Sequence, residues 1–285
     1  MELKDNSKNK DYWNRNPMTY KPFNRDFLFP EDNSERILDN EEDFVFLNKS
    51  YLKENFYLNS FFNTLNKNNF LKDSSVLDIG CGWGSSTVFL SKYSKKITSI
   101  DISNVAIEGA QKNFIFNKID NYELIEMDAE NLDFENNTFD YIFSWGVIHH
   151  SANPEKIIKE IYRVLNNGGK GTIMVYNKNS LRYWLLGFYH LYFRRIIAIA
   201  GGSEAFNGLN WSNVSKKFTD GIYHKHYIPK KLKKEFLSLG FSEVNIVINH
   251  YLGKGKILPF IKTDSILGKI LSKKFGYFLT IEFIK

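Results

Sequence analysis

From residue 75 onward, short apolar runs alternate with helix-like segments. The runs are SVLDI (75–79), KITSID (96–101), YELIEMD (122–128), FDYIFSWG (139–146) and KGTIMVYN (170–177). Apolar residues at helical spacing lie between them, in segments 85–94, 103–118 and 153–167. Strand–helix–strand alternation of this kind predicts a parallel sheet with helices on both faces.

The alternation stops after residue 177. A helix is predicted over 229–241, ending near Gly240, and two strand candidates follow at 243–251 and 277–285. The chain has 285 residues and no internal repeat or low-complexity linker. We therefore predict one α/β domain with a decorated C-terminal half.

The N-terminal part has a different pattern. Residues 1–45 are polar with scattered aromatic residues, which predicts an irregular arm that docks through those aromatics. Residues 46–70 have apolar positions at helical spacing and predict a helix.

Segment 180–202, SLRYWLLGFYHLYFRRIIAIAGG, is about as long as a membrane span. Arg182, His190 and the pair Arg194 and Arg195 interrupt it, and charges at that depth are costly. We predict a helix buried in protein or lying at an apolar interface, which leaves a weak contact with a membrane surface open.

Composition narrows the classes of partner. The formal charge is +6, but the lysines are scattered among acids without an arginine-rich stripe, which counts against nucleic acid. The single cysteine, Cys81, excludes a disulfide within the chain and a cysteine-based zinc site. Together with a polar N-terminus lacking an apolar signal region, this predicts a cytoplasmic protein.

The stretch VLDIGCGWG leads a strand directly into Gly80, Gly82 and Gly84, with a helix predicted from about Ser85. Glycine permits positive φ and close approach of a ligand to the backbone. Such a turn at the carboxyl edge of a parallel sheet is where open α/β folds bind nucleotides. The spacing G-x-G-x-G differs from the G-x-G-x-x-G of dinucleotide sites, so the glycines alone leave both ligand classes open.

Three acids at successive strand ends separate these classes. Asp78 precedes the turn and would repel a diphosphate but suit an ammonium group. Asp101 ends the second strand, where a carboxylate can accept two ribose hydroxyls. Asp128 and Ala129 end the third, where a carboxylate and a backbone N–H can read adenine. Any one of these acids could instead be a helix N-cap. As a set, they favour S-adenosylmethionine over a nicotinamide cofactor.

The motifs VLDIGCGWG, SIDIS, EMDAENLDF, FDYIFSWGVIHHS and EIYRVLNNGGKGTIMVYNKNS occur in order over about residues 74–177. Together they resemble the class I S-adenosylmethionine-dependent methyltransferases, in the small-molecule branch called methyltransferase type 11. The resemblance implies that cofactor contacts come from Asp78, Gly80, Cys81, Gly82, Asp101, Ile102, Asp128, Ala129, Ser144 and Trp145. The segment NNGGK lacks the proline that many relatives have before the paired glycines. The spelling GCGWG also occurs in cyclopropane fatty acid synthases, so a lipid acceptor stays open.

The family resemblance also implies a Rossmann-like seven-stranded sheet in the order 3-2-1-4-5-7-6, with strand 7 antiparallel. The chain would then divide into an arm and helix covering the cofactor (1–70), a cofactor-binding core (71–177), a helical and aromatic lid that binds the acceptor (178–228) and a C-terminal helix and hairpin completing the same domain (229–285).

Chemistry beyond the cofactor is indicated by His149 and His150, which follow the fourth strand. Either imidazole could remove an acceptor proton or only order the loop. No third ligand at a recognisable spacing supports a metal. Candidate acceptor contacts are Trp13, Tyr183, Tyr223 and His224, although packing in the core would give the same pattern of aromatics.

The sequence thus predicts a methyltransferase that modifies an oxygen or nitrogen nucleophile of a metabolite, sugar or lipid-linked intermediate, as a monomer or homodimer. An RNA methyltransferase and a non-catalytic binding protein for the same cofactor are the alternatives.

Overall fold

A computed structural model describes residues 6–19, 38–55, 58, 61–63, 71–188, 224–249 and 266–285. Tyr223 and most of segment 180–202 lie outside these residues. Within the described ranges, no helix is long and apolar enough to cross a membrane.

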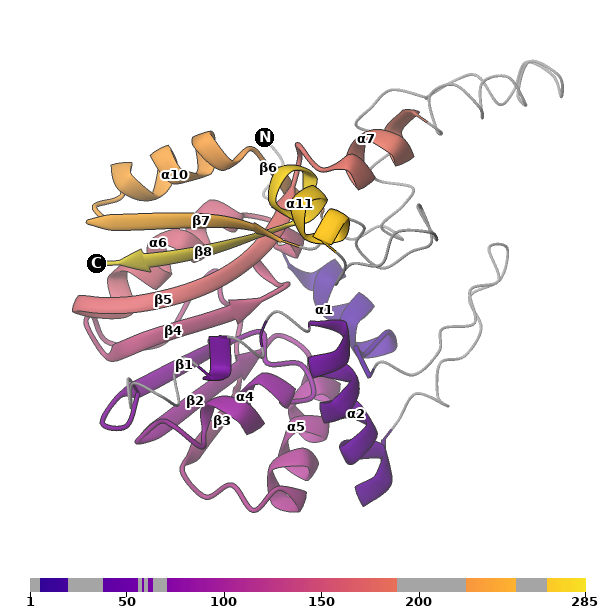
Figure 1. The fold of residues 1–285 in the computed structure, drawn as a ribbon. Coiled ribbons are helices and arrows are strands. Elements are labelled where there is room, and N and C mark those ends of the chain that lie inside the picture. The colour runs from indigo at the N-terminus through magenta and orange to yellow at the C-terminus, as the bar shows by residue number, and fades with distance from the viewer. Residues whose placement is uncertain are drawn as a thin grey trace, which may run out of the picture.

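The described strands form one mixed sheet (Figure 1). They are β1 (Ser75–Ile79), β2 (Lys96–Asp101), β3 (Tyr122–Glu126), β4 (Phe139–Trp145), β5 (Leu165–Asn177), β6 (His226–Tyr227), β7 (Glu243–Asn249) and β8 (Phe278–Ile284). The order is β3-β2-β1-β4-β5-β8-β7, and the two-residue β6 pairs with β5 off this path. Strand β8 runs antiparallel to both β5 and β7, and the neighbouring strands from β3 to β5 are parallel. Apart from the extra β6, this is the predicted order.

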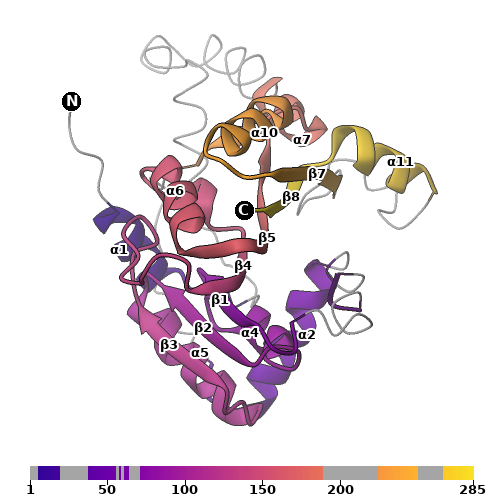
Figure 2. The ribbon, with the colours of Figure 1, turned by 90° about the vertical axis from the view of Figure 1, so that its left-hand side faces the viewer.

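The described helices cover both faces of the sheet. They are α1 (Ser7–Arg15), α2 (Glu41–Glu54), α4 (Ser85–Leu90), α5 (Asn104–Phe116), α6 (Pro154–Val164), α7 (Leu181–Phe188), α10 (Pro229–Ser238) and α11 (Ile266–Phe275), with the 3-10 turn η2 (Ile148–His150). Helices α6 and α10 pack on one face, and α2, α4 and α5 lie on the other (Figure 2).

Strand alternation determines which residues meet each layer. Leu77 and Ile79 of β1 belong to the large apolar cluster that includes α6 and α10. Val76, one position away, packs instead with Leu90 of α4 and Tyr51 of α2. Successive side chains of a strand point to opposite faces, so the period-2 pattern accounts for both layers.

The N-terminal part differs from the prediction. Ser7–Arg15 is a helix, α1, and not part of an irregular arm. Helix α2 begins at Glu41 because the Asn40 side chain accepts the Asp43 N–H at 2.9 Å and acids fill the first turn, which suits the positive end of a helix dipole.

Strand β5 begins five residues earlier than the predicted residue 170. Helix α6 ends at Val164 and the chain continues directly as strand, with a register shift between Phe139 and Tyr141 of β4. Gly168 has φ of +77° within this stretch, and a glycine accommodates the local irregularity.

Candidate active site

A cavity of about 240 Å³ opens at the carboxyl ends of the parallel strands. Helices α1 and α2 lie beside this end of the sheet (Figure 1) and contribute to the cavity wall. Eight of the predicted cofactor residues line it: Gly80, Cys81, Gly82, Asp101, Ile102, Asp128, Ala129 and Trp145. The structure therefore brings together most of a set that runs from Asp78 to Trp145 in the chain.

The glycine turn forms the floor of this cavity. The N–H groups of Gly80 and Cys81 donate to the Ile100 carbonyl at 2.8 and 3.0 Å, which ties the turn to β2. Gly80 has φ of +73°, and a Cβ there would lie 2.2 Å from Val147. Gly82 has φ of +55°, and a Cβ there would meet nothing within 4 Å, although Gly82 lines the cavity. A side chain at Gly82 would thus occupy space left for a ligand.

Asp101 stands over the same turn. Its two carboxylate oxygens accept the backbone N–H groups of Gly82 and Ser103, each at 2.9 Å. Burial raises the pKa of this carboxyl, and the backbone hydrogen bonds from Ser103 and Gly82 offset part of that rise. Because each carboxylate oxygen has more than one acceptor site, Asp101 can still accept hydroxyl groups from the cavity.

Asp78 is placed differently from the prediction of an ammonium contact. It is 1% exposed, does not line the cavity, and accepts the hydroxyls of Ser86 at 2.6 Å and Thr87 at 2.8 Å. Burial raises the pKa of this carboxyl to about 6 although both hydroxyls lower it. Asp78 therefore holds the first turn of α4 under the glycine turn.

Ser144 also lies behind the cavity wall. It is fully buried, and its hydroxyl donates to the Ile79 carbonyl at 3.1 Å. Its described contact joins β4 to β1, and Trp145, the next residue, faces the cavity.

The third acid, Asp128, is held by the N-terminal helix. The Asn6 amide donates to both Asp128 oxygens at 3.0 Å and to Glu130 at 2.8 Å. Glu130 in turn accepts the Ser151 hydroxyl at 2.6 Å and the Asn153 N–H at 2.7 Å. Asn6 thus joins the loops that follow β3 and β4 at the rim of the cavity.

Asn9 makes the second attachment of α1. Its amide donates to the Asn6 side chain at 2.8 Å and to the His150 carbonyl at 2.6 Å. Asn6 and Asn9 are both buried, and both line the cavity. Helix α1 therefore docks through buried amides as well as through the predicted aromatic contact of Trp13.

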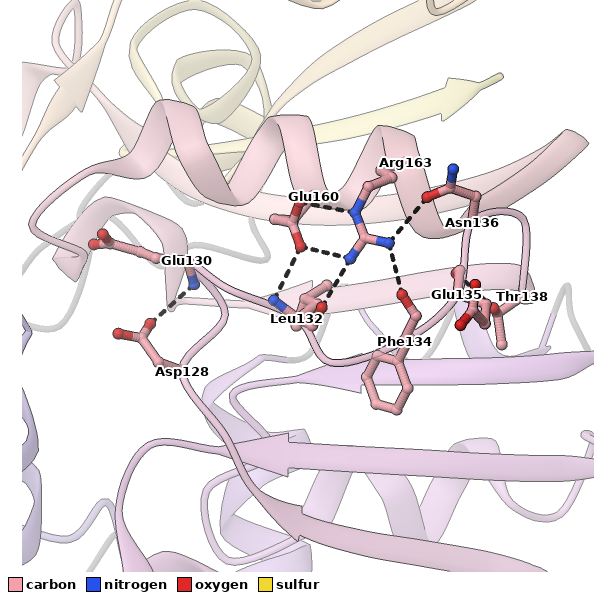
Figure 3. A network of polar contacts seen from close by, with 9 residues as sticks. All are labelled: Asp128, Glu130, Leu132, Phe134, Glu135, Asn136, Thr138, Glu160 and Arg163. Carbon is pink, nitrogen blue, oxygen red and sulfur yellow. Dashed lines mark hydrogen bonds and ion pairs between the residues drawn. The ribbon is translucent and has the colours of Figure 1, made fainter.

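A charged bracket, the pair of Arg163 and Glu160 on α6, fixes the loop beyond Asp128 through hydrogen bonds to its backbone (Figure 3). Arg163 of α6 donates to the carbonyls of Leu132 at 2.8 Å and Phe134 at 2.6 Å, and pairs with Glu160 at 2.7 Å. Glu160 closes the bracket by accepting the Leu132 N–H at 2.9 Å. Since Asp128 and Ala129 begin this loop, Arg163 stabilises the backbone that presents them.

Much of the remaining cavity wall is aromatic. Trp13, Tyr51, Trp145, Tyr176 and Phe278 line it. The Trp145 indole N–H donates to the side-chain oxygen of Asn55, the residue that follows α2, at 3.1 Å. This hydrogen bond fixes the orientation of the ring. Rings held in this way form a rigid apolar wall.

His150 lines the cavity as well, and its ring centre lies 5.5 Å from that of Trp13. His149 points elsewhere: it is fully buried, and its ring centre lies 3.8 Å from that of Tyr176. Neither ring nitrogen of His149 has a hydrogen-bond partner within the part of the chain that the structure describes. Burial, followed by the nearby His150, His224 and His226, lowers the pKa of His149 well below its ordinary value, so this imidazole is neutral.

Two further acceptor candidates, Tyr183 and His224, do not line the cavity. The His224 ring centre is 5.0 Å from that of His150, and the Tyr183 ring is 4.7 Å from His226. Tyr223 lies outside the described residues. Among the described residues, no three or more His, Cys, Asp or Glu side chains lie together where they could hold a metal ion.

Sequence reasoning missed Asn6, Asn9, Glu130, Asn55 and Tyr176 as cavity or rim residues. The hydrogen bond between Asn6 and Glu130 joins positions 124 residues apart, and a single sequence has no signal for such a pair. Tyr176 could have been found, because it ends the predicted fifth strand at the same sheet edge as the three acids.

Comparison with known proteins agrees with this geometry. Residues 77–173 match a family model described as "Methyltransferase domain". The chain is 26% identical over 191 residues to a demethylmenaquinone methyltransferase of Oceanobacillus iheyensis, which covers 64% of this chain and 76% of that protein. It is 32% identical over 116 residues to 2-methyl-6-phytyl-1,4-hydroquinone methyltransferase 1 of Oryza sativa, with 40% and 34% covered.

The fold has solved counterparts. A crystal structure of a SAM-dependent methyltransferase from Thermotoga maritima superposes with a TM-score of 0.53 at 17% identity, covering 86% of this chain and 97% of that one. The strand order, the glycine turn, the family match and the named relatives agree. Residues 77–173 thus match a methyltransferase domain, and the fold, the site and the relatives together support a class I S-adenosylmethionine-dependent methyltransferase.

Proposed function

We propose that this enzyme methylates a small molecule with an apolar ring or prenyl-like body, at an oxygen or nitrogen nucleophile that His150 deprotonates. The observation that carries the proposal is one cavity whose wall combines two carboxylates, several aromatic rings and one imidazole.

The acids and glycines of the cavity wall fit the cofactor. The open space at Gly82 leaves room beside the backbone, and the Asp101 carboxylate has acceptor capacity for ribose hydroxyls. Asp128 and the backbone of Ala129 would take the adenine edge. When bound, S-adenosylmethionine supplies a methyl group that its sulfonium already activates.

The aromatic residues of the cavity wall would position the acceptor. Methyl transfer is an in-line displacement, so the main task of the protein is to hold the two reacting atoms close and aligned. Trp145 is fixed through Asn55, and Tyr176 packs against His149, so both rings are held before a ligand arrives. A flat or branched apolar molecule suits such a wall.

His150 is the residue we assign to proton removal. Its backbone is fixed on both sides, because its N–H donates to Val147 at 2.8 Å and its carbonyl accepts Asn9. Its ring remains at the cavity surface, where an imidazole can take the proton of an acceptor hydroxyl as the methyl bond forms. His149 packs behind it and has no access to the cavity.

The named relatives support an apolar acceptor. One is named for demethylmenaquinone and another for a phytyl hydroquinone, both ring compounds with a long hydrocarbon tail. A third relative, 34% identical over 95 residues, is named a sterol 4-C-methyltransferase of Caenorhabditis elegans. Deprotonation of a hydroquinone also activates its ring carbons, so carbon methylation is the second candidate.

Two measurements test the proposal. Calorimetry should show binding of S-adenosylhomocysteine to the wild type, lost in Asp101→Ala and retained in Asp133→Ala, a change in an exposed acid of the loop after β3. Absence of binding to the wild type would contradict the cofactor site.

The second measurement concerns the acceptor. Transfer of labelled methyl to a prenylated hydroquinone should exceed transfer to the same head group without its tail, and NMR of the product identifies the methylated atom. His150→Ala should lower kcat about a hundredfold, and His224→Ala far less, since its ring is not part of the cavity wall. Equal transfer with and without the tail would refute the apolar acceptor, and a normal rate in His150→Ala would refute the base.

A further inference from the structure

Helix α11 presents its apolar residues to solvent. Ile266 is 81% exposed, Ile270 58% and Leu267 52%, and Phe275 is partly exposed at the end of the helix. In a ten-residue helix the only buried residue is Gly268. An exposed apolar surface of this kind marks an interaction site more often than an ordinary solvated face.

Helix α10 gives an internal comparison. It is also rich in lysine, but Leu232 and Phe236 are buried in the main apolar cluster and its lysines face solvent. That is the usual arrangement of an amphipathic surface helix. Helix α11 keeps both its lysines and its large apolar side chains outside, so packing within the described part of the protein does not explain its sequence.

The charge of α11 indicates the kind of partner. Lys269, Lys273 and Lys274 are exposed, and the sequence ILGKILSKKF contains no acid. Exposed apolar side chains next to lysines match a surface that is apolar inside and anionic at its boundary. We propose that α11 docks the enzyme on a lipid bilayer that contains anionic lipids.

The position of α11 connects this surface with the cavity. Gly276 joins α11 to β8, and a Cβ there would lie 2.3 Å from the Asn249 carbonyl oxygen and 2.4 Å from that of Ser272. The junction is therefore tightly packed. Phe278, two residues later, lines the cavity. A bilayer in contact with α11 would lie close to the part of the cavity wall that Phe278 forms.

Helix α7 lies at the same end of the molecule in both views (Figures 1 and 2). It exposes Trp184 (56%) and Leu185 (38%). Tryptophan is suited to the boundary between lipid and water, because its ring is apolar and its N–H is polar. This second exposed pair has the residue types that suit a lipid surface.

Flotation with unilamellar vesicles of phosphatidylcholine and phosphatidylglycerol tests the proposal without any acceptor, so it can fail separately from the proposed function. The wild type should bind these vesicles, and bind pure phosphatidylcholine much less. Lys273→Gln with Lys274→Gln should weaken binding roughly 30-fold. The matched double change Lys233→Gln with Lys234→Gln on α10 should leave it within about twofold of the wild type.

The apolar part of the surface is tested with Ile266→Ser and Ile270→Ser, against Ile115→Ser on α5, which is 64% exposed. The α11 changes should reduce binding and the α5 change should not, with thermal unfolding unchanged in all three. The proposal is overturned if the wild type does not float, if the α10 or α5 changes weaken binding as much as those in α11, or if the α11 changes instead dissociate a dimer.

Discussion

Replacement of Asp78 by Asn should make the stability of the protein less sensitive to a rise in pH from about 4 to 7. Asp78 is almost fully buried beneath α4, and its only described donors are two neutral hydroxyls on one carboxylate oxygen. An asparagine oxygen can accept both hydroxyls, and the amide occupies the volume of the second oxygen. The change thus removes a buried charge while leaving the local hydrogen bonds in place.

The sign and size follow from the pKa of Asp78. Burial raises it from 3.8 to about 6, so the folded protein binds the proton more tightly than the unfolded chain does. Stability is therefore highest below pH 4 with respect to this group and falls as the pH rises to about 6. The difference in pKa corresponds to roughly 3 kcal/mol of unfolding free energy, which the wild type has lost by neutral pH.

The assay is urea unfolding followed by tryptophan fluorescence at several pH values from 4.5 to 8. The advantage of Asp78→Asn over the wild type should grow by about 2 kcal/mol across this range. Parallel curves for the two proteins would refute the raised pKa.

Asp140→Asn provides a control of opposite sign. Burial opposes ionisation of Asp140, but the Ser75 N–H, the Asn166 amide and the Ser75 hydroxyl together lower the pKa of this carboxyl. The ionised carboxylate stabilises the folded protein above its ordinary pKa, and this stabilisation is lost as the pH falls. Asp140→Asn should therefore be less stable than the wild type at neutral pH.

The same Asp78 variant tests where the ammonium group of the cofactor binds. If Asp78 acts only beneath α4, the affinity for S-adenosylhomocysteine should change less than about threefold, whereas loss of a direct charged hydrogen bond would weaken binding at least tenfold. The tenfold loss would support the sequence prediction over the placement of this side chain.

Three further changes have definite expected outcomes. His149→Phe should reduce the loss of stability that the wild type shows as the pH falls below 6.5. There the unfolded chain binds a proton that the buried imidazole does not, which costs the wild type about 1.4 kcal/mol per pH unit. Thermal melting at pH 5.5 and 7.5 checks this. Gly84→Ala should cost about 2–4 kcal/mol in urea unfolding, because φ is +81° and the Cβ would lie 2.4 Å from a Phe114 ring carbon, whereas Gly82→Ala should cost less and mainly weaken cofactor binding in calorimetry. Arg163→Lys should destabilise by about 1–3 kcal/mol, since one ammonium cannot replace the fork that reaches two carbonyls; unchanged unfolding would contradict the bracket.

The central sheet was predictable because its strands are apolar runs separated by helices. Residues 75–79 and 96–101 match β1 and β2 at both ends. Runs buried on both sides have few alternatives, and the glycines after β1 and the helix cap at Ser103 limit their length. The order of strands required the family resemblance as well, because periodicity alone does not determine which strands pair.

Helix α1 was not predictable by the same rule. Its sequence, SKNKDYWNR, has no apolar stripe, and the buried contacts are made by Asn6 and Asn9. Long-range amide hydrogen bonds leave no periodic trace in a sequence. The direction of Asp78, in contrast, was available: it shares a strand face with Val76, opposite Leu77 and Ile79, and that face is covered by α4.

The acids at the cavity are held by neutral donors. Backbone N–H groups bind Asp101, and the Asn6 amide binds Asp128. No ion pair to either acid occurs among the described residues. Neutral donors fix a carboxylate without cancelling its field, so this part of the cavity wall favours a cationic ligand. Behind the aromatic residues of the cavity wall, burial keeps the His149 imidazole uncharged beside Tyr176. The lining of one cavity thus combines carboxylates held by neutral donors with aromatic rings packed around an uncharged, buried imidazole.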